Sequence, residues 1–318
     1  MQNPTFMGIE LILEKESTVL SKYLMCAPTA DFDFDDEGNI WVVGGSTFTK
    51  AVMVLGRDLQ EVDCPVNLKS RPPWIKMIGD YVFFLSPREI ETADRKSGRV
   101  IDKKELDHPM DGCFVFQGSI YAFYYSNDSL ARISPDVPIQ EGQRSDQRFC
   151  LESGVASNQE RFFTFKYLHF EGIEASVYDS IQRPARRFVL DEWLHMRGKN
   201  THVNRYWKYA VDIKGRIFCY NTYPSLDPDD RSYNGLPHPT SNIWALNPDG
   251  KLSWITDATM EIRKIAVSPD GRLLVMGMRS PFSPENGFLQ NADATLDYLS
   301  SGTGLECRFR IYNIRERE

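Results

Sequence analysis

Two runs of alternating character near the N-terminus predict a β-hairpin. Residues 31–35 read Asp-Phe-Asp-Phe-Asp, which places the aromatic rings on one face of a strand and the carboxylates on the other. Residues 40–43 read Ile-Trp-Val-Val, a run suited to a strand that is covered on both faces. Gly38 lies between the two runs and can adopt the positive φ that a tight hairpin turn requires.

The same hairpin unit recurs along the chain when it is aligned on the turn residue. The six turns lie at positions 38, 79, 118, 159, 215 and 271, so successive steps are 41, 39, 41, 56 and 56 residues. A step near 40 residues is the size of one four-stranded propeller blade. Further strand-like runs follow each hairpin, so the repeat predicts an all-β fold, a six-bladed β-propeller of four-stranded blades.

The last repeat supplies three strands and then reaches the charged C-terminal residues. The run at residues 8–15 precedes the first blade, and we expect it to provide the missing strand and close the ring, which removes exposed sheet edges. We therefore expect residues 1–318 to form a single propeller domain. The expected blades are approximately 30–64, 73–106, 109–138, 152–190, 207–256 and 261–314.

Two turns resemble repeats of known propeller families. Residues 36–41, Asp-Glu-Gly-Asn-Ile-Trp, are similar to the turn of NHL-type and gluconolactonase-like six-bladed propellers. Residues 268–273, Ser-Pro-Asp-Gly-Arg-Leu, resemble the repeat of TolB-type and WD40-like propellers. The gluconolactonase-like resemblance implies a divalent metal at the channel mouth, held partly by a Glu beside Gly-Pro-x-Trp. That motif is absent here, where the nearest candidate is Gly8-Ile9-Glu10, so no cofactor is predicted and a divalent cation is the alternative.

Composition narrows the range of partners and compartments. A net charge of −7 and a pI near 5.4 give no electrostatic reason to expect nucleic acid or an anionic membrane as a partner. The sequence contains no run of 18 apolar residues. Its N-terminus lacks a basic region followed by an apolar one, so we expect a cytoplasmic protein unless a signal peptide has been removed. The six cysteines form no CxxC pair, as expected of reduced thiols.

Three long insertions are expected on one face of the propeller. They are residues 191–207, 222–241 and 279–305, and each falls between blades or between the second and third strands of a blade. Both kinds of connection leave a propeller at the same end of its channel. Long loops on a rigid scaffold often carry binding or catalytic groups, so this face is the predicted site for a small polar molecule or a protein segment.

Candidate binding residues lie in these insertions and where the inner strands begin. Aromatic and charged groups that converge at the mouth of a channel can bind a polar ligand. The alternative is that they only fill the channel or bond to neighbouring backbone. The ligand-binding candidates are Asp31, Trp74, Asp111, Tyr206, Trp207, Tyr223, Arg231, Tyr233, Arg263 and Phe282.

The catalytic candidates are His195, His202 and His238, because imidazole can act as acid, base or metal ligand near neutral pH. Their spacing matches no known ligand pattern, so solvated or capping histidines are the alternative and no metal site is predicted. The aspartates at 31, 33 and 35 do not form a calcium loop, because Gly38 falls two places too late.

Two classes of function therefore remain open. The first is a ligand-binding, protein-binding or scaffold propeller that uses the insertion-bearing face. The alternative is a small-molecule enzyme, a hydrolase or lyase, with its site at the channel mouth on the same face. The sequence has no Gly-x-Ser-x-Gly elbow, P-loop or dinucleotide-binding fingerprint that would favour a particular reaction.

Overall fold

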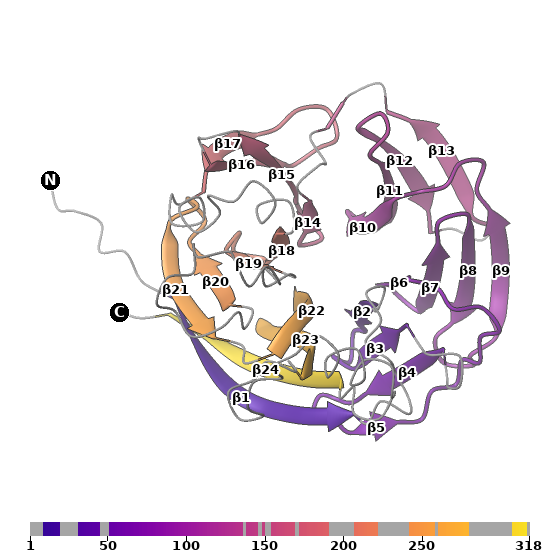
Figure 1. The fold of residues 1–318 in the computed structure, drawn as a ribbon. Coiled ribbons are helices and arrows are strands. Elements are labelled where there is room, and N and C mark those ends of the chain that lie inside the picture. The colour runs from indigo at the N-terminus through magenta and orange to yellow at the C-terminus, as the bar shows by residue number, and fades with distance from the viewer. Residues whose placement is uncertain are drawn as a thin grey trace, which may run out of the picture.

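The protein is a ring of six four-stranded antiparallel sheets (Figure 1). The structure is a computed structural model, and it describes residues 9–19, 31–44, 51–135, 138–145, 148–149, 154–168, 172–190, 207–221, 242–257, 260–279 and 307–316. The arrangement confirms the six-bladed β-propeller that the repeat predicted. Within the described ranges, no helix is long and apolar enough to cross a membrane.

Blades 1 to 5 each take their strands in chain order, from the channel outward. Blade 6 has β22, β23 and β24 followed by β1 at its outer edge. The inner strands are β2 (Asp31–Phe34), β6 (Trp74–Ile78), β10 (Gly112–Phe116), β14 (Val155–Ser157), β18 (Trp207–Val211) and β22 (Met260–Val267). The second strands are β3 (Ile40–Val43), β7 (Tyr81–Ser86), β11 (Ser119–Tyr124), β15 (Phe162–Leu168), β19 (Ile217–Asn221) and β23 (Arg272–Arg279). The third strands are β4 (Val52–Leu55), β8 (Glu89–Asp94), β12 (Ser129–Ser134), β16 (Gly172–Tyr178), β20 (Asn242–Leu246) and β24 (Cys307–Glu316). The outer strands are β5 (Glu61–Val62), β9 (Val100–Glu105), β13 (Gln140–Arg144), β17 (Arg186–Val189), β21 (Leu252–Asp257) and β1 (Ile9–Val19).

The ring is closed by β1, which pairs antiparallel with β24 (Figure 1). The paired register runs from Ile9 opposite Glu316 to Val19 opposite Cys307. Glu16 adds side-chain contacts to this pairing, because its carboxylate lies 2.6 Å from Arg310 Nε. The predicted closure by the N-terminal strand is therefore confirmed, and the strand extends beyond residue 15 to Val19.

The turn alignment is reflected in the backbone. Gly38 has a φ of 78°, which confirms the expected left-handed turn residue. In blade 4 the aligned position is occupied by Gln159, which adopts the same left-handed conformation at a φ of 71°. The four other aligned glycines, Gly79, Gly118, Gly215 and Gly271, have φ values of 56°, 68°, 81° and 83°.

Asp35 organises the first of these turns. Its buried carboxylate accepts hydrogen bonds from the backbone N–H groups of Glu37 and Asn39 at 2.9 and 2.8 Å, and from the Trp41 indole at 3.1 Å. Asp212 makes the corresponding bond in blade 5, where it accepts the backbone N–H four residues later at 2.9 Å. The Asp35 carboxylate, which follows the alternating Asp-Phe run, therefore stabilises the turn through these hydrogen bonds.

The third blade extends further than the sequence pattern indicated. Its fourth strand, β13, lies after residue 138, where we expected the blade to end. The strand reads Gln-Glu-Gly-Gln-Arg and follows two prolines, Pro135 and Pro138, so it carries neither the alternation nor the β-branched residues of a recognisable strand.

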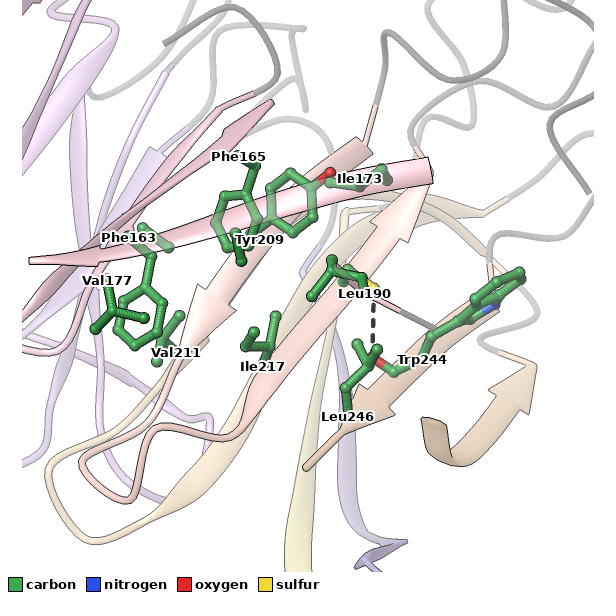
Figure 2. Packing of buried hydrophobic residues seen from close by; sticks show 13 residues of the cluster. Phe163, Phe165, Ile173, Val177, Leu190, Tyr209, Val211, Ile217, Trp244 and Leu246 are labelled. Atoms are coloured by element: carbon green, nitrogen blue, oxygen red, sulfur yellow. Dashed lines mark hydrogen bonds between the residues drawn. The ribbon is translucent and has the colours of Figure 1, made fainter. Parts of the chain in front are cut away.

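The hydrophobic core lies between neighbouring blades. Between blades 4 and 5, aromatic and aliphatic side chains interdigitate in a cluster of thirteen buried residues (Figure 2). Phe165 of β15 stacks on Tyr209 of β18 with ring centroids 3.6 Å apart and ring planes inclined by 8°. Each inner strand therefore packs against a neighbouring blade, which fixes its position around the channel.

Candidate functional site at the channel mouth

Three charged side chains from three different blades meet where the inner strands begin, an end of the channel that we call the channel mouth. Asp31 is the first residue of β2, Lys76 belongs to β6 and Lys264 to β22. The Lys76 Nζ lies 3.1 Å from Asp31 Oδ2, and the Lys264 Nζ donates to Asp31 Oδ1. The backbone N–H of Ile75 also donates to Asp31 Oδ2, at 3.0 Å. One carboxylate is thus held between two ammonium groups.

Burial makes this contact different from a surface ion pair. The exposed fractions of the side chains are 8% for Asp31, 13% for Lys76 and 23% for Lys264. Charges this far from bulk water interact more strongly than exposed ones, and they are costly to bury unless they are paired. The two lysine side chains are the more exposed members of the cluster.

A β-bulge directs Lys264 toward this cluster. The register of β22 against β23 shifts between Ile262 and Lys264, which makes Arg263 the extra residue. The bulge reverses the alternation, so Ile262 and Ile265 both pack in the hydrophobic cluster between blades 5 and 6. Lys264 faces blade 1 instead, where its Nζ lies 4.7 Å from the centroid of the Phe32 ring and donates to the Phe32 carbonyl.

The surroundings shift the proton affinities of the three groups in different directions. Burial would raise the pKa of Asp31, but attraction to Lys264 and Lys76 outweighs it and leaves that pKa below its ordinary value. Burial would lower the pKa of Lys76, but Asp31 outweighs it and raises that pKa. Burial lowers the pKa of Lys264, and repulsion from Lys76 adds to the effect. Lys264 is therefore the ammonium group that gives up its proton more readily.

Two further titratable groups lie beside the cluster. Asp33 accepts hydrogen bonds from the backbone N–H groups of Met77 and Phe34, each at 2.9 Å, and burial raises its pKa. Cys113 of β10 is a free cysteine, and burial raises the pKa of its thiol to about 11, so it is neutral at pH 7. The carboxylate that opposes the two lysines most firmly is consequently Asp31.

The described residues at the channel mouth do not fit the divalent cation that the gluconolactonase-like resemblance implies. In the part of the chain that the structure describes, no group of three or more His, Cys, Asp or Glu side chains is placed to hold a metal. The oxygens of Asp31 already accept from two ammonium groups and a backbone N–H. A cation beside Asp31 would be repelled by Lys76 and Lys264.

The structure places five of the residues that the sequence selected. Asp31 is the centre of the cluster, and Arg263 forms the bulge, with its carbonyl accepting from the Tyr220 hydroxyl at 2.6 Å. Asp111 accepts from the backbone N–H of Tyr125 at 2.7 Å. Trp74 packs partly buried against the core between blades 2 and 3, and Trp207 is the first residue of β18. The other candidates, Tyr206, Tyr223, Arg231, Tyr233, Phe282, His195, His202 and His238, lie outside the described residues.

Sequence reasoning missed both lysines of the cluster. Lys76 interrupts an otherwise apolar inner strand, Trp-Ile-Lys-Met-Ile, whereas Lys264 lies in a strand that also contains Glu261 and Arg263. For Lys76, a lone lysine in an apolar strand was the available signal, because burying an ammonium group requires a partner. The charged residues around Lys264 offered no such signal. The sequence did not predict the β-bulge in β22, so Arg263 was selected as a site residue in place of its neighbour Lys264.

The longest connections start and finish at the channel mouth. They leave from the ends of β17, β19 and β23, and the chain returns at the starts of β18, β20 and β24. All six strand ends lie at this end of the ring because the strands within each blade alternate in direction. The cluster around Asp31 therefore lies on the face that carries the insertions.

Comparisons with known proteins establish the fold. No family model matches the chain, and no curated protein sequence matches it. Regucalcin from Agrobacterium tumefaciens, a calcium-binding protein, is similar in structure with a TM-score of 0.55 and 12% identity, over 94% of this chain and 96% of that chain. A candidate exported protein from Bacteroides fragilis has a TM-score of 0.54 and 10% identity, over 98% and 96%. A chain of a mitotic checkpoint complex has a TM-score of 0.52 and 10% identity, over 84% and 91%. The regucalcin match confirms the fold-level resemblance that the turns indicated.

Proposed function

We propose that this protein is a ligand-binding β-propeller that holds a small anionic molecule at the channel mouth. The observation that carries the proposal is the convergence of Lys76 and Lys264 on Asp31, from three separate blades. Both lysines form their ion pairs with a single carboxylate, Asp31, among the described residues, and two convergent ammonium groups favour an anionic ligand. Partial burial of these side chains strengthens that preference, because charges removed from bulk water are screened less.

The hydrogen-bonding capacity of the lysines supports the same conclusion. An ammonium group has three N–H donors. Among the described groups, Lys76 donates to Asp31 and to the Ile75 carbonyl at 2.8 Å, and Lys264 donates to Asp31 and the Phe32 carbonyl. One donor of each lysine is then left for a ligand oxygen, and a carboxylate or phosphate could accept from both.

Calorimetric titration of the purified protein with a panel of small carboxylates and phosphates tests this function. We expect at least one anion to bind, and Lys264→Met and Lys76→Met each to weaken its binding about tenfold or more, or about 1.4 kcal/mol. The control is Lys166→Met, which removes an exposed lysine of β15. Far-UV circular dichroism verifies that each variant is folded. The proposal fails if no anion binds, or if binding is unchanged in both channel variants.

A small-molecule enzyme at the same site is the second candidate. The observation in its favour is the lowered pKa of Lys264, because an amine that releases its proton more readily is a better general base. The test is an assay for hydrolysis of lactones and for β-elimination from carboxylate-bearing substrates. If the protein is an enzyme of this kind, the activity should be lost in Lys264→Met and kept in Lys166→Met. Saturable binding without turnover across the panel would favour the binding function.

A further inference from the structure

A cavity lined by both charged and apolar side chains lies at the opposite end of the ring from the channel mouth. It opens between blades 4 and 5, where the turns joining inner and second strands lie, and its volume is about 200 Å³. Blade 4 contributes Arg161 and Arg186, and blade 5 contributes Lys214 and Pro248. We call this cavity the inter-blade groove. It shares no lining residue with the Asp31 cluster.

The floor of the inter-blade groove is apolar and rigid. Phe163 and Val177 line it and are only 2% and 7% exposed, because they belong to the core cluster between blades 4 and 5. Figure 2 shows these two side chains together with Val211 at one end of that cluster. Pro248 adds apolar surface from the other blade. A ligand in the groove would therefore contact a preformed hydrophobic surface.

The lining of the inter-blade groove carries more positive than negative charge. Arg161 is paired with Asp179, which also lines the groove, at 2.9 Å, and Lys214 is paired with Glu316 of blade 6 at 2.6 Å. Arg186 lies over the Phe188 ring at 4.7 Å, and within the described ranges no carboxylate forms an ion pair with it. Its guanidinium group keeps donors for a carboxylate or phosphate, which it can bind in a bidentate manner.

We propose that the inter-blade groove binds a small molecule with one carboxylate or phosphate group on a compact apolar body. The anionic group would lie between Arg186 and Lys214, and the apolar body would cover Phe163, Val177 and Pro248. A cavity of about 200 Å³ has room for a compact compound of this kind. This site goes beyond the proposed function of the channel mouth and does not depend on it.

Strand register supplies a matched control for the test. In the β16–β17 pair, Arg186 lies opposite Val177, a residue of the groove floor, and Arg187 lies opposite Ser176. Side chains of successive strand residues point to opposite faces of the sheet, so Arg187 points away from the groove. Arg186→Gln and Arg187→Gln remove the same charge from neighbouring positions and differ only in the face affected.

The experiment is calorimetric titration of the full chain with benzoate, phenyl phosphate, inorganic phosphate and the cation benzylammonium. We expect benzoate or phenyl phosphate to bind more tightly than inorganic phosphate, and benzylammonium not to bind. Arg186→Gln and Lys214→Gln should each weaken binding about tenfold. Arg187→Gln and the channel variant Lys264→Met should leave it unchanged, which separates this site from the channel mouth.

Each outcome decides the proposal. The tighter of benzoate and phenyl phosphate identifies the preferred anionic group. The Lys264→Met variant separates the inter-blade groove from anion binding at the channel mouth. In that variant, the proposal is overturned if neither aromatic anion binds at millimolar concentration, if inorganic phosphate binds as tightly as they do, or if adding Arg186→Gln and adding Arg187→Gln have the same effect. Loss of binding in Lys264→Met with retention in Arg186→Gln would assign the anion to the channel mouth instead.

Discussion

Replacing Asp31 by asparagine should destabilise the protein because it leaves Lys76 and Lys264 buried without their shared counter-charge. At the 3.1 Å separation of Lys76 Nζ and Asp31 Oδ2, Coulomb attraction is about 5 kcal/mol at an effective dielectric constant of about 20. Desolvation cancels much of that gain, and removing one partner of a buried pair costs about 3–5 kcal/mol. We expect Asp31→Asn to lower the free energy of unfolding by that amount in urea denaturation at pH 7.

Asp33 provides the comparison, since it lies two residues away on the same strand. Its carboxylate bonds to the backbone N–H groups of Met77 and Phe34, and burial has already raised its pKa. Among the described residues, Asp33 makes no ion pair with either lysine, whereas Asp31 pairs with both, so Asp33→Asn should cost less than Asp31→Asn. The double variant Asp31→Asn/Lys264→Met should recover part of the loss, because it removes one of the two uncompensated ammonium groups.

The pH dependence of the Asp31→Asn effect has a defined sign. The folded-state pKa of Asp31 lies below its unfolded value of about 3.9, so its stabilisation is complete above that value and is lost as pH falls through the folded pKa. The difference between wild type and Asp31→Asn should be full at neutral pH and shrink in acid. Equal effects of Asp31→Asn and Asp33→Asn at pH 7, or a difference that does not shrink in acid, would refute the electrostatic account.

Two further predictions concern other parts of the ring. Gln159→Gly should raise the free energy of unfolding by about 0.5–1 kcal/mol, because a residue with a side chain is strained at a left-handed φ of 71°. Glu160→Gly, at the next residue, is the control and should lower the free energy of unfolding. A Gln159→Gly variant less stable than wild type would contradict this reasoning. The rate of alkylation of Cys113 by iodoacetamide can be measured by mass spectrometry of its peptide. This rate should increase about tenfold per pH unit up to pH 10, because burial raises the pKa of the thiol to about 11. A rate that levels off by pH 9 would be the contrary result.

The sequence predicted the fold more completely than it predicted the candidate site. Turn residues repeat because every hairpin needs a left-handed backbone at the same place, and Gln159 shows that this requirement holds even where glycine is absent. β13 was missed because its residues are polar and follow two prolines. At the channel mouth, Asp31 was selected because an inner strand begins there, but its partners come from residues 45 and 233 positions away. Only the ring geometry and the bulge at Arg263 bring Lys76 and Lys264 to it.

The pairing of β1 with β24 also determines how the ring responds to tension. Ile9 lies opposite Glu316, so the two ends of the described chain leave the same end of one antiparallel ladder. A force applied to these ends peels the two strands apart, and the ladder's hydrogen bonds break one after another instead of sharing the load. The strand pair that closes the ring is therefore also the first to separate under force. It opens when the two ends are pulled apart, before any other blade is strained.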